Sequence, residues 1–212
     1  MSLTIHTISL GPLETNCYVI VDAERPRECC LIDVGLWPDP LLDFLREQNL
    51  TPTHVLLTHG HGDHMGGVHE LVEAYPGLKV CCPQADEEML DSPEKNLSAS
   101  FLMGIQAPSA DVLLTPSESL AIGSYSLDLL DTSGHTLGGM SFYCAAAQAV
   151  FTGDALFFRS VGRTDIPDGS HSNLITNIRT HLMTLPDETL VYPGHGPPST
   201  IADEHIHNPF LR

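Results

Sequence analysis

The chain has 212 residues, of which 42% are hydrophobic and 17% are charged, values that are typical of a globular protein. Its formal net charge is −18 with only nine Lys and Arg, which argues against nucleic acid as a partner, because that affinity depends on Lys and Arg neutralising phosphates. No apolar run approaches the roughly 20 residues of a membrane span, so no membrane partner is expected.

The termini and the cysteines indicate the expected organisation and compartment. Residues 1–6 lack a basic segment followed by an apolar one, so no signal peptide is expected. Cys29-Cys30 and Cys81-Cys82 are adjacent pairs within predicted strands, which suits buried free thiols better than disulfides. We therefore expect one domain covering residues 1–212, located in the cytoplasm.

The first part of the chain predicts strands separated by turns and two helices. Apolar residues at helical spacing predict a helix over residues 38–49, and a second helix is predicted over residues 66–75. The latter belongs to a strand–helix–strand unit that ends with residues 78–82. The predicted strands are residues 3–10, 16–21, 29–34, 54–58 and 78–82.

The second part of the chain begins with its least regular segment, residues 83–116, which we interpret as an insertion beside the functional site. Within it, residues 84–90 have the composition of a short helix. A helix with one apolar stripe is predicted over residues 170–185. Strands are predicted over residues 119–122, 125–131, 140–144, 149–152 and 189–192.

A dense cluster of metal-binding residue types follows the strand at residues 54–58. Its sequence is Thr58-His59-Gly60-His61-Gly62-Asp63-His64. Imidazoles and carboxylates are ligands that zinc, iron and manganese accept. In extended backbone, residues two apart face the same side, so His59 and His61 can bind one ion together. The two glycines permit a sharp turn that frees Asp63 and His64 to point elsewhere.

Three later segments place another ligand type beside a glycine at the end of a predicted strand. They contain His135 (in Ser-Gly-His-Thr), Asp154 (in Thr-Gly-Asp-Ala) and His195 (in Gly-His-Gly). Each alone is a weak signal, but their combination with the cluster at residues 58–64 predicts one shared site.

With these four segments, the sequence resembles the metallo-β-lactamase superfamily over almost its full length. Further segments resemble the short, single-domain bacterial relatives of glyoxalase II, the hydroxyacylglutathione hydrolases. These are Thr-Asn-Cys-Tyr at 15–18, Gly-Arg-Thr-Asp at 162–165, Tyr-Pro-Gly-His-Gly-Pro at 192–197 and Asn-Pro-Phe at 208–210. The resemblance implies an α/β fold, a four-layer αβ/βα sandwich with two mixed sheets face to face and helices outside.

The resemblance also implies the ligands of two divalent ions, zinc first, with iron or manganese as alternatives. His59, His61 and His135 would hold one ion, Asp63, His64 and His195 the other, and Asp154 would bridge them. The spacing argument independently supports only the pair His59 and His61. Several of these ligand positions differ in the β-lactamases proper, so antibiotic hydrolysis is not expected.

The expected activity is that of a metal-dependent hydrolase, a thioesterase of glyoxalase II type. It would act on a small-molecule, glutathione-like thioester through a metal-bound hydroxide, with Asp63 as the catalytic residue that orients the water or accepts its proton. Three alternatives stay open: an iron-dependent persulfide dioxygenase using His59, His135 and Asp154, a lactonase-type hydrolase, and a metal-binding protein without turnover.

The chain after the last predicted ligand carries little positive charge. Residues 197–212 contain Arg212 as their sole Lys or Arg. In two-domain glyoxalase II enzymes a C-terminal domain supplies basic residues that hold glutathione, so this chain is expected to bind the glutathione part weakly.

Overall fold

The structure, a computed structural model, describes residues 2–212 and contains two six-stranded sheets. In spatial order, the first sheet consists of β1 (Leu3–Leu10), β2 (Thr15–Asp22), β3 (Glu28–Ile32), β4 (Thr51–Leu56), β5 (Lys79–Pro83) and β6 (Val112–Leu114). The second consists of β14 (Ser199–Thr200), β13 (Leu190–Pro193), β10 (Ala149–Gly153), β9 (Met140–Cys144), β8 (Tyr125–Asp131) and β7 (Ser119–Ile122). Both sheets are mixed, because β3 to β6 run parallel, as do β10 and β13, whereas the other neighbours are antiparallel.

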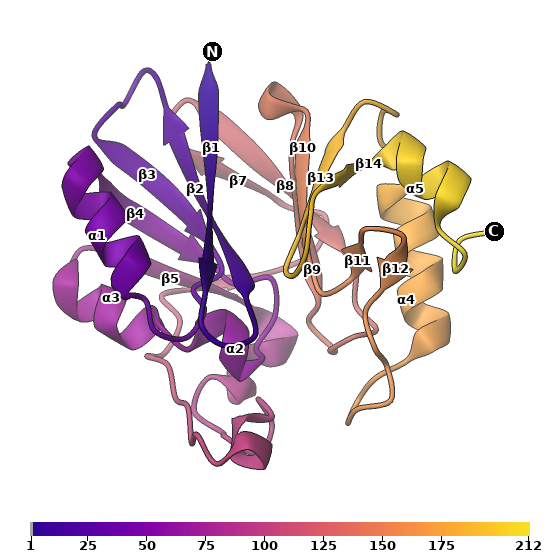
Figure 1. The fold of residues 1–212 in the computed structure, drawn as a ribbon, viewed down its shortest axis with the longest axis horizontal. Helices are drawn as coiled ribbons and strands as arrows, with labels where there is room; N and C mark the ends of the chain where they lie inside the picture. Colours follow the sequence, from indigo (N-terminus) through magenta and orange to yellow (C-terminus); the bar gives the residue numbers. More distant parts are fainter. Residues whose placement is uncertain (1) are drawn as a thin grey trace.

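Helices cover the outer face of each sheet (Figure 1). On the first sheet these are α1 (Asp39–Gln48) and α3 (Val68–Ala74), and on the second α4 (His171–Asn177) and α5 (Ile201–His207). The remaining elements are short: α2 (Gly62–Met65), η1 (Gln84–Met89), η2 (Ser98–Phe101), η3 (Ala145–Ala147), η4 (Ile178–Leu182), which continues α4, and the hairpin of β11 (Leu156–Phe157) and β12 (Ser160–Val161). The four-layer αβ/βα sandwich implied by the resemblance is therefore confirmed.

Three apolar cores hold these four layers together. Between the sheets, buried side chains such as Ile20 pack against partners such as Phe142. Outside the first sheet, Leu31 and its neighbours pack against α1 and α3, and outside the second sheet Val150 packs against α4 and α5. Because adjacent residues face opposite sides of a strand, β2 and β3 contribute side chains to both the inner and the outer core, which explains their nearly continuous apolar sequences.

The predicted elements agree with most of the structure and differ from it around the metal-binding cluster. The strand predicted over 54–58 ends at Leu56, and the helix predicted over 66–75 is Val68–Ala74, preceded by the separate turn α2. The segment 83–116 contains η1, as expected, but also β6, a strand that the sequence analysis missed. The hairpin β11–β12, strand β14 and helix α5 were also not predicted.

The described residues include no helix that is both long enough and apolar enough to cross a membrane. All six cysteines are buried and unpaired within residues 2–212. Burial raises the pKa of several of these thiols, that of Cys29 to about 12, so they are protonated and poorly reactive.

Candidate metal centre

All seven residues predicted as ligands lie at one edge of the sandwich, where strands of both sheets end. His59 and His61 follow β4, Asp63 and His64 lie on α2, and the other three follow strands of the second sheet. Two backbone hydrogen bonds join the sheets here, from Met140 N to Thr58 O (2.9 Å) and from Asn16 N to Gly194 O (2.8 Å). The structure therefore brings together segments that are far apart in the sequence.

The first group of nitrogen atoms belongs to His59, His61 and His135. Nδ1 of His61 lies 3.0 Å from Nε2 of His59 and 2.9 Å from Nε2 of His135. All three side chains are buried, and one ligand atom from each lies within 4.8 Å of the others. This is the set expected for one ion.

The second group consists of Asp63, His64 and His195, again with ligand atoms within 4.8 Å of one another. Nε2 of His195 lies 3.2 Å from Nε2 of His64 and 3.2 Å from Oδ2 of Asp63. This is the set expected for the other ion. Both Asp63 and His64 lie on α2, which begins directly after His61.

Asp154 lies between the two groups. Its Oδ2 is 3.6 Å from Nε2 of His135, and its Oδ1 is 3.2 Å from Nε2 of His64 and 3.6 Å from Nε2 of His195. These contacts to Oδ1 lack hydrogen-bond geometry, so among the described residues this buried oxygen has no hydrogen-bond partner. A buried carboxylate oxygen without a partner is costly, and a bound cation would remove that cost.

The hydrogen bonds around the imidazoles show how well this arrangement fits metal ions. Each of three histidines donates from Nδ1 to an oxygen outside the centre. The acceptor is the carboxylate of Asp33 for His64 (2.8 Å), the backbone oxygen of Leu13 for His195 (2.9 Å) and the backbone oxygen of Arg163 for His135 (2.7 Å). These acceptors take the Nδ1 protons, so the Nε2 atoms of the neutral rings carry lone pairs. Lone pairs of His64 and His195 that face each other at 3.2 Å repel unless a cation or proton lies between them. The donor set thus fits divalent metals, although ligation itself stays a prediction.

Two acidic residues that the sequence analysis did not assign hold the ligands in place, and the first is Asp33. Its Oδ2 accepts hydrogen bonds from Nδ1 of His64 and from the hydroxyl of Thr58, both at 2.8 Å. Since that hydroxyl gives its only proton to Asp33, it accepts the Nδ1 proton of His59 at 3.0 Å. Asp33 therefore orients one histidine of each group. In the sequence, the feature that could have identified this residue is that it is a lone Asp within the apolar run Cys-Cys-Leu-Ile-Asp-Val.

The second is Asp86, on η1 of the segment that we expected to lie beside the site. Its fully buried carboxylate accepts hydrogen bonds from Gly60 N (3.0 Å), Thr136 Oγ1 (2.7 Å) and Gly138 N (2.7 Å). It thereby joins the loop of His59 and His61 to the turn of His135. No local pattern marks this residue, because its three partners lie 26 to 52 positions away.

The pKa values reflect this concentration of buried charge. Burial, followed by repulsion from His135 and His64, lowers the pKa of His61 to about 3. Burial also disfavours the charged form of His64, but the carboxylates of Asp154, Asp63 and Asp33 outweigh it and raise its pKa well above the ordinary value. The same imidazoles hold the pKa of Asp154 well below its ordinary range despite its burial. The pKa of Asp63 is also lowered, so the carboxylates of Asp63 and Asp154 are ionised at neutral pH, as ligands must be.

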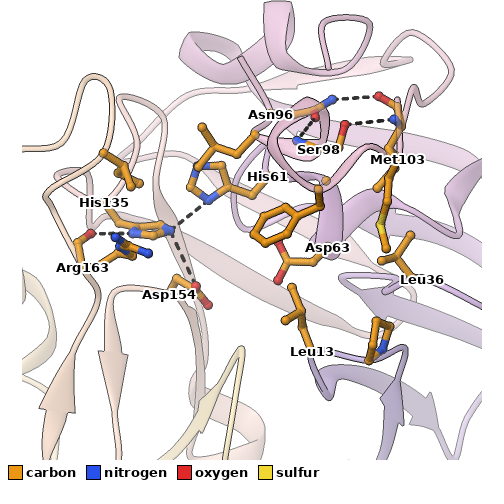
Figure 2. Close-up of a pocket in the computed structure, with 16 residues that line it drawn as sticks. Leu13, Leu36, His61, Asp63, Asn96, Ser98, Met103, His135, Asp154 and Arg163 are labelled. Atoms are coloured by element: carbon orange, nitrogen blue, oxygen red, sulfur yellow. Dashed lines mark hydrogen bonds and ion pairs between the residues drawn. The ribbon is translucent and has the colours of Figure 1, made fainter. Parts of the chain in front are cut away.

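A cavity of about 370 Å³ opens directly onto this centre. His61, Asp63, His135 and Asp154 form its floor, and its walls come from the β1–β2 loop, the β3–α1 loop and the insertion of residues 83–116 (Figure 2). Arg163 lies at its rim, where Nε and Nη2 donate to Asp165 at 2.8 and 3.0 Å. This volume accommodates a small-molecule substrate.

Residues 10–195, which include all seven predicted ligands, match the family described as the metallo-beta-lactamase superfamily. The chain belongs to this superfamily. Among curated relatives, the probable metallo-hydrolase YqgX of Bacillus subtilis is 36% identical over 95% of this chain and 94% of its own length. The hydroxyacylglutathione hydrolase GloC of Haemophilus influenzae is 32% identical over 99% and 98%.

Solved structures of the superfamily agree with this fold. The B3 metallo-beta-lactamase BLEG-1 is 37% identical and superposes with a TM-score of 0.92, covering 98% of this chain and 99% of its own. TTHA1623, solved in a di-iron-bound form, is 36% identical with a TM-score of 0.82, covering 97% and 100%. Superfamily membership and the donor set together support a metal-dependent hydrolase with a dinuclear metal centre.

Proposed function

We propose that this protein is a thioesterase of the glyoxalase II type. The observation that carries the proposal is that seven residues of the expected types converge, in two groups joined by Asp154, on the floor of a cavity of about 370 Å³. The 32% identity with a hydroxyacylglutathione hydrolase over nearly the whole chain supports the same activity.

His59, His61 and His135 would hold one ion, Asp63, His64 and His195 the second, and Asp154 would bridge them. Divalent ions bound there would lower the pKa of a coordinated water to about 7 and polarise a substrate carbonyl. Asp63 faces the cavity, and its pKa is lowered because His64 and His195 outweigh the effect of burial, so its ionised carboxylate can accept the proton of the attacking water. A thiol of pKa near 8.5 leaves as thiolate without a general acid.

The charge around the cavity argues for weak recognition of the glutathione part. Among the described residues that line the cavity, Arg163 is the one Lys or Arg, and its guanidinium is already paired with Asp165. The net charge of −18 gives an anionic substrate no long-range attraction. We therefore expect a high KM for glutathione thioesters, and less than about a tenfold change in kcat/KM, or about 1.4 kcal/mol, when the glutathione part is trimmed.

The test is hydrolysis of lactoylglutathione and of a truncated-thiol thioester by protein reconstituted separately with zinc, iron and manganese, with metal content measured on the same samples. Oxygen consumption with a persulfide substrate, and hydrolysis of a lactone, are measured in parallel. Thioester turnover that is lost on chelation and restored by metal supports the proposal. Oxygen uptake without thioester turnover would favour the persulfide dioxygenase instead. A kcat/KM that is a hundredfold or more higher for lactoylglutathione than for the truncated thioester would contradict the loose specificity.

A second candidate function is β-lactam hydrolysis. The sequence analysis did not expect it, but the 37% identity and TM-score of 0.92 with a B3 metallo-beta-lactamase favour including it. Hydrolysis of a chromogenic cephalosporin by the same metal-loaded samples tests it, and a kcat/KM above that for thioesters would make it the primary activity.

A further inference from the structure

The walls of the cavity above the metal centre are apolar. Side chains from four separate segments form them, namely Leu13, Leu36, Phe101, Met103, Ile105 and Ile166. Figure 2 shows Leu13, Leu36 and Met103 around the same opening as Asp63. Three of the six are unusually exposed for their type, with relative accessibilities of 48% for Leu13, 62% for Phe101 and 44% for Met103. Large apolar side chains that stay exposed around a cavity mark a surface that binds an apolar partner.

The polar side chains of the cavity wall are already engaged within the protein. Asn96 donates to Met89 O (3.0 Å) and Ile105 O (2.9 Å), and its Oδ1 accepts from Ser98 N (3.0 Å). The hydroxyl of Ser98 in turn accepts from Ile105 N (2.9 Å). These bonds fix the shape of the insertion, so Asn96 has no free hydrogen-bonding group for a ligand.

The cavity also offers no free positive charge apart from any bound metal. The guanidinium of Arg163 is paired through two hydrogen bonds with Asp165. Polar ligands would therefore lose hydration here and find few uncommitted partners, whereas apolar groups would only leave water.

We infer that the cavity selects substrates by an apolar chain of several carbons next to the scissile carbonyl, on either its acyl or its thiol side. This inference rests on the proposed hydrolase function and specifies its substrate class. The floor of the cavity contains Asp63 and Asp154, so a carbonyl placed at the metal centre leaves its substituents between the apolar walls. Burial of each methylene group should raise kcat/KM about fourfold, which corresponds to ~0.8 kcal/mol, until the cavity is filled.

Two substrate series test this with metal-loaded protein. The first varies the acyl chain from acetyl to octanoyl on N-acetylcysteamine, a neutral thiol, and the second varies the thiol from ethanethiol to hexanethiol on an acetyl group. The expected result is a rise of about fourfold per methylene in at least one series, and the series that rises identifies the side that occupies the cavity. Values of kcat/KM within twofold across both series would overturn the inference.

A matched pair of variants locates the effect. Phe101 lines the cavity, whereas the adjacent Leu102 is 96% exposed and does not line it. We expect Phe101→Ser to lower the octanoyl-to-acetyl ratio of kcat/KM by at least about threefold and Leu102→Ser to leave that ratio unchanged. Equal effects of the two substitutions would contradict the assignment of the chain to this cavity.

Calorimetric binding of neutral carboxamides, from butanamide to octanamide, to metal-free protein separates this inference from the proposed function. Affinity that rises with chain length while no thioester is hydrolysed would sustain the apolar cavity and reject the thioesterase. Thioester turnover with affinity and kcat/KM both independent of chain length would sustain the thioesterase and reject the apolar cavity.

Discussion

Asp154 is the residue on which both groups of the metal centre depend. Its two oxygens face His135 on one side and His64 and His195 on the other. We predict that Asp154→Ala lowers kcat/KM by more than about 100-fold, since removal of outer-shell partners alone costs 10–100-fold, and leaves fewer than two ions bound. Elemental analysis and thioester hydrolysis measure this. Asp128→Ala, on an exposed position of β8, is the control, and a variant at Asp154 that keeps two ions and full activity would refute the bridging role.

Asp33 acts on the centre without facing the cavity. It adopts a left-handed backbone conformation (φ 53°), which Asn tolerates, so Asp33→Asn tests the hydrogen bonds while keeping the backbone. The carboxylate accepts from Thr58 N at Oδ1 and from the Thr58 hydroxyl and His64 Nδ1 at Oδ2, whereas an amide has one oxygen, so its NH2 group must face at least one of these donors. We predict a loss of about 10–100-fold in metal affinity, measured by competition with a chelating dye.

A suitable control for this variant is Asp22→Asn. Asp22 is also buried and accepts hydrogen bonds, but it lies at the far end of β2 and contacts Ser124 instead of the centre. If both variants bind metal as tightly as the unsubstituted protein, Asp33 has no positioning role.

Among single residues, those with a strong local pattern were predictable and those defined by tertiary contacts were not. Six of the seven ligand candidates stand directly beside a glycine near a strand end, His64 lies two residues after Gly62, and the structure brings all seven together. Asp86 could not be found in this way, because its role comes from three partners supplied by other loops. The apolar walls of the cavity were equally hidden, since residues 101–105 show no clear periodicity.

At the scale of elements, the turn before His135 must fit closely against α4. Gly134 has φ +134°, and a Cβ there would lie 2.4 Å from Leu174 N and 2.6 Å from Leu174 Cα. We predict that Gly134→Ala lowers the free energy of unfolding by about 1–3 kcal/mol, because either the turn or the helix must move. It should also weaken the metal bound through His135.

Urea denaturation and metal titration of this variant are compared with Gly77→Ala. A Cβ at Gly77 would meet nothing within 4 Å, and its φ is not positive. Equal stabilities of the two variants would show that the turn and α4 are free to separate.

Strands were predicted correctly where buried and exposed residues alternate along the chain. Elements that form through contacts with residues far away in the sequence were missed. Strands β7, β8 and β9 have the predicted bounds. Helix α5 was missed because its contacts come from distant residues: the fully buried carboxylate of Glu204 accepts a bifurcated hydrogen bond from Arg159 N, 45 residues away. Thr200, whose hydroxyl caps Asp203 N, was the local signal for this helix.

For the molecule as a whole, the buried histidines make the stability of the metal-free protein depend on pH. Burial is the main cause that lowers the pKa of His59 and His61, that of His61 to about 3, whereas in the unfolded chain each takes up a proton near pH 6.5. Between these pH values the unfolded state binds more protons. The free energy of unfolding should therefore fall as the pH drops below about 6.5, by at most about 1.4 kcal/mol per pH unit for each histidine.

His64 and His195 have raised pKa values, so their stabilising contributions are complete below the unfolded pKa of about 6.5 and decline as pH rises from there to the folded values; they oppose the effect mainly above about pH 6.5. We expect chelator-stripped protein to show a lower urea midpoint at about pH 5.0 than at about pH 6.5, the window in which His59 and His61 dominate, and His61→Asn to reduce the difference. A midpoint that stays constant or rises on acidification would contradict the prediction.

The division of the donor set between the two sheets has a consequence for biosynthesis. The pairs His61–His135 and His64–His195 span 74 and 131 residues. A nascent chain on the ribosome that has released only its first sheet holds four of the seven donors, and the centre is complete only after His195 emerges. Binding to the native state alone then stabilises the finished fold by mass action. Metal uptake would thus report that synthesis has passed β13, and shortage of metal would leave the two halves of the sandwich joined by their apolar core and by hydrogen bonds such as that from Met140 N to Thr58 O.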